Sequence, residues 1–246
     1  MNISKYIAKT HSIFCISGMF AGDWMWHNTR PKFQDCNLYL MKPPLCSISE
    51  NIEGLTKAIC SEVRNIPDQI TLVGNSLGAY IALDVASKIP DKIENIVISG
   101  SAGFAPVNFS QDKEMPISNR KRLGEHIARL ICFDESKLTD FMIQNIISTF
   151  NDHFVTILRL AAESNSVDIE DVLNKIQCPM HAIWGENDVF TPFHTVSDML
   201  NKYNISYEIV QDCGHSPMFE KPDEFADLLN KEMSNKGLFS NFKQVA

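Results

Sequence analysis

The sequence predicts an α/β protein with a mostly parallel central sheet flanked by helices and a helical insertion before its last two strands. Three observations lead to this prediction. Short apolar runs alternate with helical patterns, as they do in βαβ units. The pentapeptide GNSLG, at residues 74–78, joins one apolar run directly to a helical pattern. From about residue 103 to residue 176 the strand signal stops and helix-like segments replace it.

The predicted strands are short apolar runs bounded by Gly, Pro or polar residues, at 12–18, 37–41, 70–73, 93–100, 180–185 and 206–211. A capping-box pattern at Ser47 and Glu50 predicts a helix that begins there and runs to about Asn65. Further helices are predicted after Ser76 as far as Pro90, over 194–202, and over the last helical pattern near 225–233. Because strands alternate with long helices, neighbouring strands are expected to be parallel.

The helix-like segments at 119–132, 137–150 and 153–162 are interpreted as a cap over the sheet edge where such folds bind ligands. The predicted organisation is therefore a core made of 1–102 and 177–246, with a helical cap subdomain at 103–176. The basic cluster at 120–122 is interpreted as a solvated helix face in preference to a grip on an anionic substrate. The role of the 237–246 tail stays open.

The chain has 246 residues, of which 44% are hydrophobic and 21% charged, as expected for a folded domain. Its net charge of −8 disfavours binding to nucleic acid or to an anionic membrane. The 7 cysteines are scattered and include no C-x-x-C pair, so reduced and mostly buried thiols are expected. We expect a cytoplasmic protein with a small-molecule substrate, as a monomer or a homodimer.

Three residues share the pattern of nucleophilic catalysis. Ser76 lies on the predicted turn between strand and helix, which strains its backbone, and two flanking glycines avoid collisions with the adjacent strand and helix. A serine hydroxyl needs a base, and His215 lies in a Gly-flanked loop just beyond a late strand. Asp188 follows the preceding strand and can orient the imidazole. Since parallel strands end at the same edge of a sheet, these residues can converge there. Glu186 and Asp212 are the competing carboxylates, and Asp188 is favoured over both.

The order Ser, Asp, His and the motifs GNSLG, WGENDVFTP and CGHSPMFEKPDEF resemble the α/β-hydrolase fold superfamily, in its cap-bearing esterase, thioesterase and carbon–carbon hydrolase branch. The resemblance runs from Ser12 to about Met233. It implies that Ser76 is the nucleophile, His215 the general base and acid, and Asp188 the orienting carboxylate. The chain departs from larger members at its start. Those members open with two further strands, for which this chain has no room, so we expect a trimmed version of the fold.

An oxyanion needs backbone donors aimed at the developing charge. Leu77, which follows the nucleophile at a helix start, is expected to supply one N–H group. The resemblance implies Met19 as the second donor, after the glycine that closes the first strand. Relatives usually have His-Gly at this place, whereas this chain has Ser17-Gly18.

The predicted function is hydrolysis of a carboxylic ester or thioester with a small to medium hydrophobic acyl group, through an acyl-enzyme. No cofactor or metal is expected, because the histidines show no metal-ligand spacing. The alternatives are a lyase or cyclase that uses the same triad for proton abstraction, and a non-catalytic ligand-binding protein. The predicted pocket is largely apolar. Its expected wall is Phe20, Trp24 and Trp26, the cap residues Phe141 and Phe154, and Met218 beside the histidine.

Overall fold

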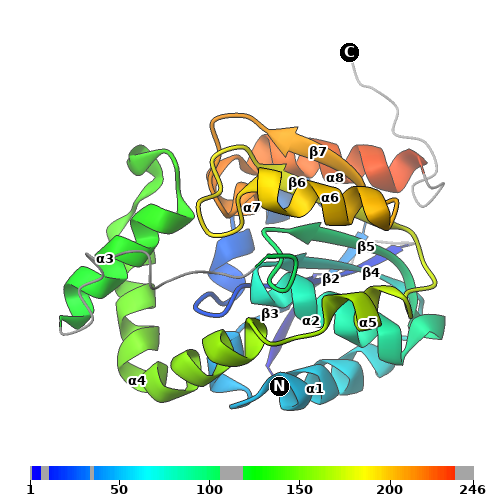
Figure 1. The fold of residues 1–246 in the computed structure, drawn as a ribbon, viewed down its shortest axis with the longest axis horizontal. Helices are drawn as coiled ribbons and strands as arrows, with labels where there is room; N and C mark the ends of the chain where they lie inside the picture. Colours follow the sequence, from blue (N-terminus) through cyan, green and yellow to red (C-terminus); the bar gives the residue numbers. More distant parts are fainter. Residues whose placement is uncertain (1, 7–10, 34–35, 106–118, 236–246) are drawn as a thin grey trace.

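The computed structural model describes residues 2–6, 11–33, 36–105 and 119–235, and one sheet of seven strands runs through them (Figure 1). The strands are β1 (Ile3–Tyr6), β2 (His11–Ile16), β3 (Cys36–Met41), β4 (Ile70–Asn75), β5 (Ile93–Ser99), β6 (Met180–Gly185) and β7 (Ser206–Val210). Their order in space is β1-β3-β2-β4-β5-β6-β7. All neighbours are parallel except β1 and β3, so the predicted fold class is confirmed.

The structure differs from the sequence prediction at the N-terminal end. The sequence predicts no strand before Ser12, but β1 pairs antiparallel with β3, and Ile3 lies opposite Met41. One strand therefore precedes β2, where the prediction had none. A four-residue strand with a single neighbour carries too short a pattern to be separated from a loop by periodicity.

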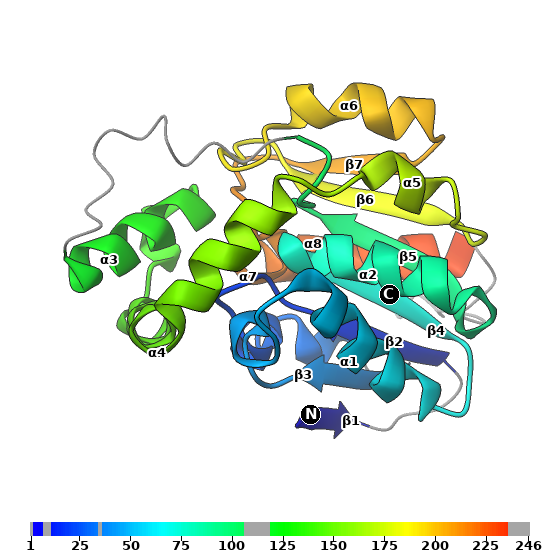
Figure 2. The same ribbon diagram turned by 60° about the horizontal axis from the view of Figure 1, so that its bottom comes forward.

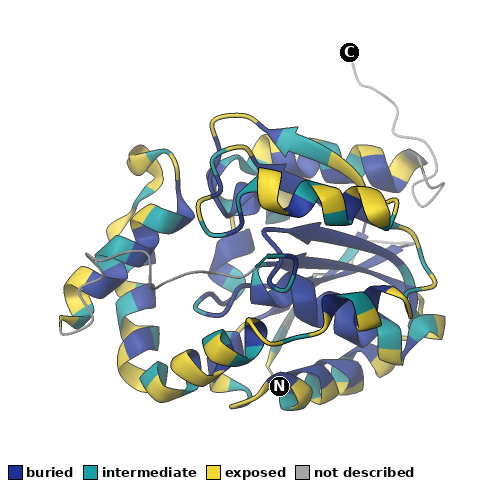
Figure 3. Ribbon diagram, viewed as in Figure 1, coloured by how far each residue is buried: buried dark blue, intermediate teal, exposed yellow. Residues whose placement is uncertain are grey.

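The helices are α1 (Ile52–Arg64), α2 (Leu77–Lys88), α3 (Arg120–Ile131), α4 (Asp140–Ser164), α5 (Ile169–Leu173), α6 (Phe193–Lys202), α7 (Pro217–Glu220) and α8 (Pro222–Asn235). In Figure 2, α1 and α2 lie in front of the sheet and α8 lies behind it. The sheet is thus covered on both faces, and β2 and β4 are buried along their whole lengths (Figure 3). Double coverage explains why these strands read as continuous apolar runs.

Helix α1 begins later than the capping-box pattern predicts. Ser47 ends a short 3-10 turn, and its hydroxyl donates to the Pro44 carbonyl at 2.7 Å. The N-cap is instead Asn51, whose side-chain oxygen accepts from the Gly54 N–H at 2.7 Å. The prediction was wrong because the Ser47 hydroxyl is already engaged in the preceding turn.

Helices α3 and α4 pack against each other and extend to one side of the sheet layers (Figures 1 and 2). Helix α4 is interrupted at His153, whose backbone angles are φ −130° and ψ 23°, close to the break that the sequence predicts between two helices. Helix α5 packs on α2. The division into a core and a 103–176 cap stays a prediction, and residues 106–118 of that cap and the 237–246 tail lie outside the described residues.

Candidate active site

Ser76 lies on the turn between β4 and α2, with φ 58° and ψ −126°. This backbone conformation is strained for a residue with a side chain and is typical of functional sites. The flanking glycines are required by close approach: a Cβ on Gly78 would lie 2.4 Å from the Ile16 carbonyl oxygen, and one on Gly74 would lie 2.5 Å from Ala79 Cα. The spacing of GNSLG is therefore a packing requirement of the turn.

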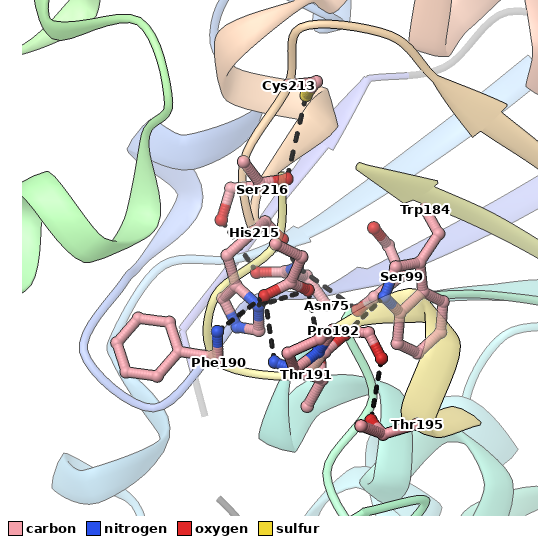
Figure 4. Close-up of polar contacts among 12 residues, drawn as sticks. Asn75, Ser99, Trp184, Phe190, Thr191, Pro192, Thr195, Cys213, His215 and Ser216 are labelled. Atoms are coloured by element: carbon pink, nitrogen blue, oxygen red, sulfur yellow. Dashed lines mark hydrogen bonds and ion pairs between the residues drawn. The ribbon is translucent and has the colours of Figure 1, made fainter. Parts of the chain in front are cut away.

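His215 and Asp188 meet at the carboxyl end of the sheet, in the loops that follow β7 and β6. His215 Nδ1 lies 3.0 Å from Asp188 Oδ1 and 2.9 Å from Oδ2. Both residues are buried, and the Asp188 side chain is only 1% exposed. The carboxylate also accepts from the N–H groups of Phe190 and Thr191 at 2.9 and 3.0 Å, and from the Thr191 hydroxyl at 2.7 Å (Figure 4). These donors fix its orientation and compensate for the cost of burying its charge.

Asn75, the residue before the serine, ties the end of β4 to the histidine loop. Its side-chain N–H donates to the carbonyl oxygens of Ser99 at 3.2 Å and of His215 at 3.0 Å (Figure 4). The Ser216 hydroxyl donates to Asn75 Oδ1 at 3.3 Å. Sequence reasoning missed this residue, because the motif leaves its position unspecified.

Ser76 and His215 line the same cavity, whose volume is about 50 Å³. Its wall is mostly apolar and includes Phe20, Trp24, Met25, Ile131, Ile146 and Phe190. Among the described residues that line it, His215 is the only one with an ionisable side chain. Met19 and Leu77 line it too, so both residues expected to supply oxyanion donors border the same cavity as the serine. Their role as N–H donors stays a prediction.

Ser17 stands where relatives usually have a histidine. It is fully buried, and its hydroxyl makes two hydrogen bonds within this loop region. Its hydroxyl donates to the Gly22 carbonyl at 2.8 Å and accepts from Trp26 Nε1 at 2.8 Å. Both contacts brace the loop that carries Met19. The difference from the usual His-Gly pair therefore leaves this loop held by buried hydrogen bonds.

Of the six predicted pocket residues, Phe20 and Trp24 line the cavity and the other four do not. Trp26 and Met218 are fully buried in the core, since Trp26 packs on Phe225 and donates to Ser17. Phe141 is 57% exposed and contacts Trp24 edge-on. Phe154 packs against Phe150 and lies under the Arg120 guanidinium, which is 3.9 Å from the ring centroid.

The structure adds Phe190 to the site. Its ring centroid lies 4.9 Å from that of His215, and its N–H donates to Asp188. The only sequence signal is its position two residues after Asp188, and that does not indicate which way the ring points. The competing carboxylates Glu186 and Asp212 are both exposed, and Glu186 Oε2 lies 3.5 Å from the Asp212 backbone nitrogen.

The chain belongs to the alpha/beta hydrolase family, whose sequence profile matches residues 13–228. It is 26% identical to the 2-hydroxy-6-oxo-6-(2'-aminophenyl)hexa-2,4-dienoic acid hydrolase of Metapseudomonas resinovorans over 66% of this chain and 59% of that protein. It is 24% identical to the monoacylglycerol lipase abhd6-B of Xenopus laevis over 95% of this chain and 78% of that protein. The family and these relatives are hydrolases.

Solved structures show the same fold. The esterase EaEST of Exiguobacterium antarcticum superposes with a TM-score of 0.76 at 14% identity, over 94% of each chain. The chain spans only about 59% of the length of the dienoic acid hydrolase that it matches. In the part of the chain that the structure describes, no helix is both long and apolar enough to cross a membrane.

Proposed function

We propose that the chain is a serine hydrolase of the carboxylesterase type, acting on esters with small to medium hydrophobic acyl groups, with thioesters as a second substrate class. One observation carries the proposal. The strained serine and the carboxylate-bound histidine both face one small apolar cavity. A nucleophile, an oriented base and an adjoining apolar binding site are parts that acyl transfer uses.

In this mechanism Ser76 Oγ attacks the carbonyl carbon while His215 Nε2 takes its proton. The backbone N–H groups of Met19 and Leu77 stabilise the oxyanion. Collapse of the tetrahedral intermediate expels the alcohol or thiol, which receives the proton from His215, and leaves an acyl-Ser76. Water then attacks this ester with the same base, and the acid and the free serine result. Asp188 holds Nδ1 of the ring throughout, so that Nε2 is the atom that exchanges protons.

The cavity supports the substrate class. Its volume of about 50 Å³ suits a short acyl chain. Each methylene group that is buried against its apolar wall stabilises the enzyme–substrate complex. We therefore expect turnover to be faster for short acyl chains than for long ones. The exact limit depends on the wall at Ile146 and Phe190, which are the bulky residues on the α4 and Asp188-loop sides.

Carbon–carbon bond hydrolysis is the second candidate, because the dienoic acid hydrolase is among the relatives. The substrate that gives this relative its name is an acid and therefore an anion at neutral pH. The described residues that line the cavity offer no cationic side chain other than protonated His215. Burying an unpaired carboxylate is costly, so this chain favours neutral esters.

The test is intact-mass labelling of the wild type and of Ser76→Ala with a fluorophosphonate, followed by a graded series of acyl esters, acyl thioesters and a dienoic acid substrate. We expect one adduct on the wild type, none on Ser76→Ala, and a loss of ester turnover of about 10⁴-fold or more. Full labelling and activity of Ser76→Ala would refute the assignment. Turnover of the dienoic acid alone would move the proposal to the second candidate, and turnover without any acyl adduct would favour a lyase or cyclase.

A further inference from the structure

Glu220, the last residue of α7, carries a buried carboxylate beside the histidine loop. Its exposure is 1%. Its Oε2 accepts from the Gly214 N–H at 2.8 Å and from the Phe133 N–H at 3.2 Å, and its Oε1 accepts from the Asp134 N–H at 2.7 Å. These three donors are backbone N–H groups, and the Cys213 thiol also donates to Oε2 at 3.9 Å, so this one side chain connects two segments of main chain.

The two connected segments lie far apart in the sequence. Gly214 immediately precedes His215, whereas Phe133 and Asp134 follow the end of α3 in the helical insertion. A further hydrogen bond joins the same segments directly, because the His215 N–H donates to the Ile131 carbonyl at 2.8 Å. The main chain of the histidine is thus held from the insertion as well as from the sheet.

The main chain around Gly214 is packed too closely to accept a larger side chain. A Cβ at that position would lie 2.6 Å from the Ile131 carbonyl oxygen and 2.7 Å from the Phe133 N–H nitrogen. The end of α3 therefore lies directly against the histidine loop. Glu220 itself is not part of the cavity wall, so it acts on chemistry only through the position of its neighbours.

We infer that Glu220 is a positioning residue: it holds the histidine loop against the end of α3, and so makes the alignment of His215 with Ser76 depend on the seating of the helical insertion. This inference rests on the proposed function, in which His215 is the base. A carboxylate fits the place better than an amide, because it offers acceptors to all three N–H groups while an amide presents its own N–H donors to some of them. The position of His215 relative to Ser76 then depends on the packing of the helical insertion against the histidine loop.

The test is the rate at which a fluorophosphonate labels Ser76, followed by intact mass far below the unfolding temperature. For Glu220→Gln we expect a labelling rate about 10- to 100-fold below that of the wild type, the same final stoichiometry of one adduct, and a fall in kcat with little change in KM. Glu220→Asp keeps the charge but is one methylene shorter, so an intermediate rate is expected. If Glu220→Gln does not fold, Glu220→Asp decides the matter by the same measurement.

Glu163→Gln is the matched control. Glu163 lies near the end of α4, and its Oε2 accepts from the Ile52 N–H at 3.0 Å, so it also joins the insertion to the core through a backbone N–H group, away from the histidine. Its labelling rate should equal that of the wild type. A wild-type rate in a folded Glu220 variant, whatever its thermal stability, would overturn the inference. Failure of the wild type itself to label would instead overturn the proposed function.

Discussion

His215 Nδ1 lies 2.9 Å and 3.0 Å from the two carboxylate oxygens of Asp188, a residue that is itself held by its own loop. This contact decides which ring nitrogen carries the proton. Because the carboxylate only accepts, Nδ1 must donate, and Nε2 is left free to accept the serine proton.

Asp188→Asn should therefore lower the rate of Ser76 labelling and of ester turnover by about 10²- to 10⁴-fold. The amide carbonyl would take the N–H bonds of the loop, and the amide N–H₂ would face Nδ1 and favour the tautomer with a proton on Nε2. The measurement is kcat for a short-chain ester together with the labelling rate.

Asp212→Asn is the control for this prediction. Asp212 is exposed and has φ 48°, a conformation that Asn adopts readily. Its activity should match that of the wild type. Equal losses in the two variants would mean that the choice of Asp188 over its neighbours is wrong.

The candidate catalytic carboxylate could be predicted from the sequence, whereas several contacts around it could not. The parallel sheet predicts that the loop after β6 lies at the catalytic edge, but Glu186 follows β6 as well and Asp212 follows β7. The choice of Asp188 among the three depended on the family resemblance. The contact of Ser17 with Trp26 and the placement of Phe190 could not be predicted, because both depend on how a loop folds back on itself. β1 was missed for a related reason: its pairing partner β3 lies far along the chain and leaves no local pattern.

Gly100→Ala should impair the site through sterics alone. Gly100 has φ +56°, and a Cβ there would lie 2.7 Å from both Cε1 and Nδ1 of His215. The ring must shift, and we expect a loss of kcat of about 10- to 100-fold, with a destabilisation of about 1–2 kcal/mol from the left-handed backbone. Kinetics at a temperature where the variant is folded, together with urea unfolding, test both parts.

Gly103→Ala is the matched control, since Gly103 has φ +88° and its Cβ would lie 3.0 Å from Val167 Cγ2, away from the histidine. It should show the destabilisation without the kinetic loss. If the two variants lost activity equally, the clash with the ring would not be the cause.

Ser17→Ala should destabilise the fold and slow the chemistry moderately. The change leaves the Trp26 indole N–H and the Gly22 carbonyl without the hydroxyl between them, and a buried polar group left unpaired costs about 1–3 kcal/mol. Since the same loop carries Met19, we expect the labelling rate to fall by less than about 10-fold. Urea unfolding measures the first effect.

Ser17→Thr retains the hydroxyl and serves as the comparison. If Ser17→Ala were as stable as the wild type, the two hydrogen bonds would carry no net stabilisation. A rate loss as large as that of Asp188→Asn would instead mean that Ser17 acts in the chemistry itself.

The cysteines should be unreactive in the folded protein. Burial raises the pKa of the Cys178 thiol to about 11 and that of Cys46 to about 12, and it also raises the pKa of Cys213, beside the histidine loop. A raised pKa keeps a thiol protonated at pH 8, where only about a thousandth of Cys178 would be thiolate. Unfolding returns the thiols to an ordinary pKa near 8.5 and makes them reactive.

Titration with a disulfide reagent at pH 8 should therefore detect less than about one thiol per native chain within minutes, and all 7 thiols in urea. Cys178 is of intermediate exposure whereas the other six are buried, so Cys178→Ser should remove most of the slow native reaction. Rapid modification of the native Cys178→Ser variant, with loss of ester turnover, would show that a buried thiol such as Cys213 becomes exposed through local opening of the histidine loop.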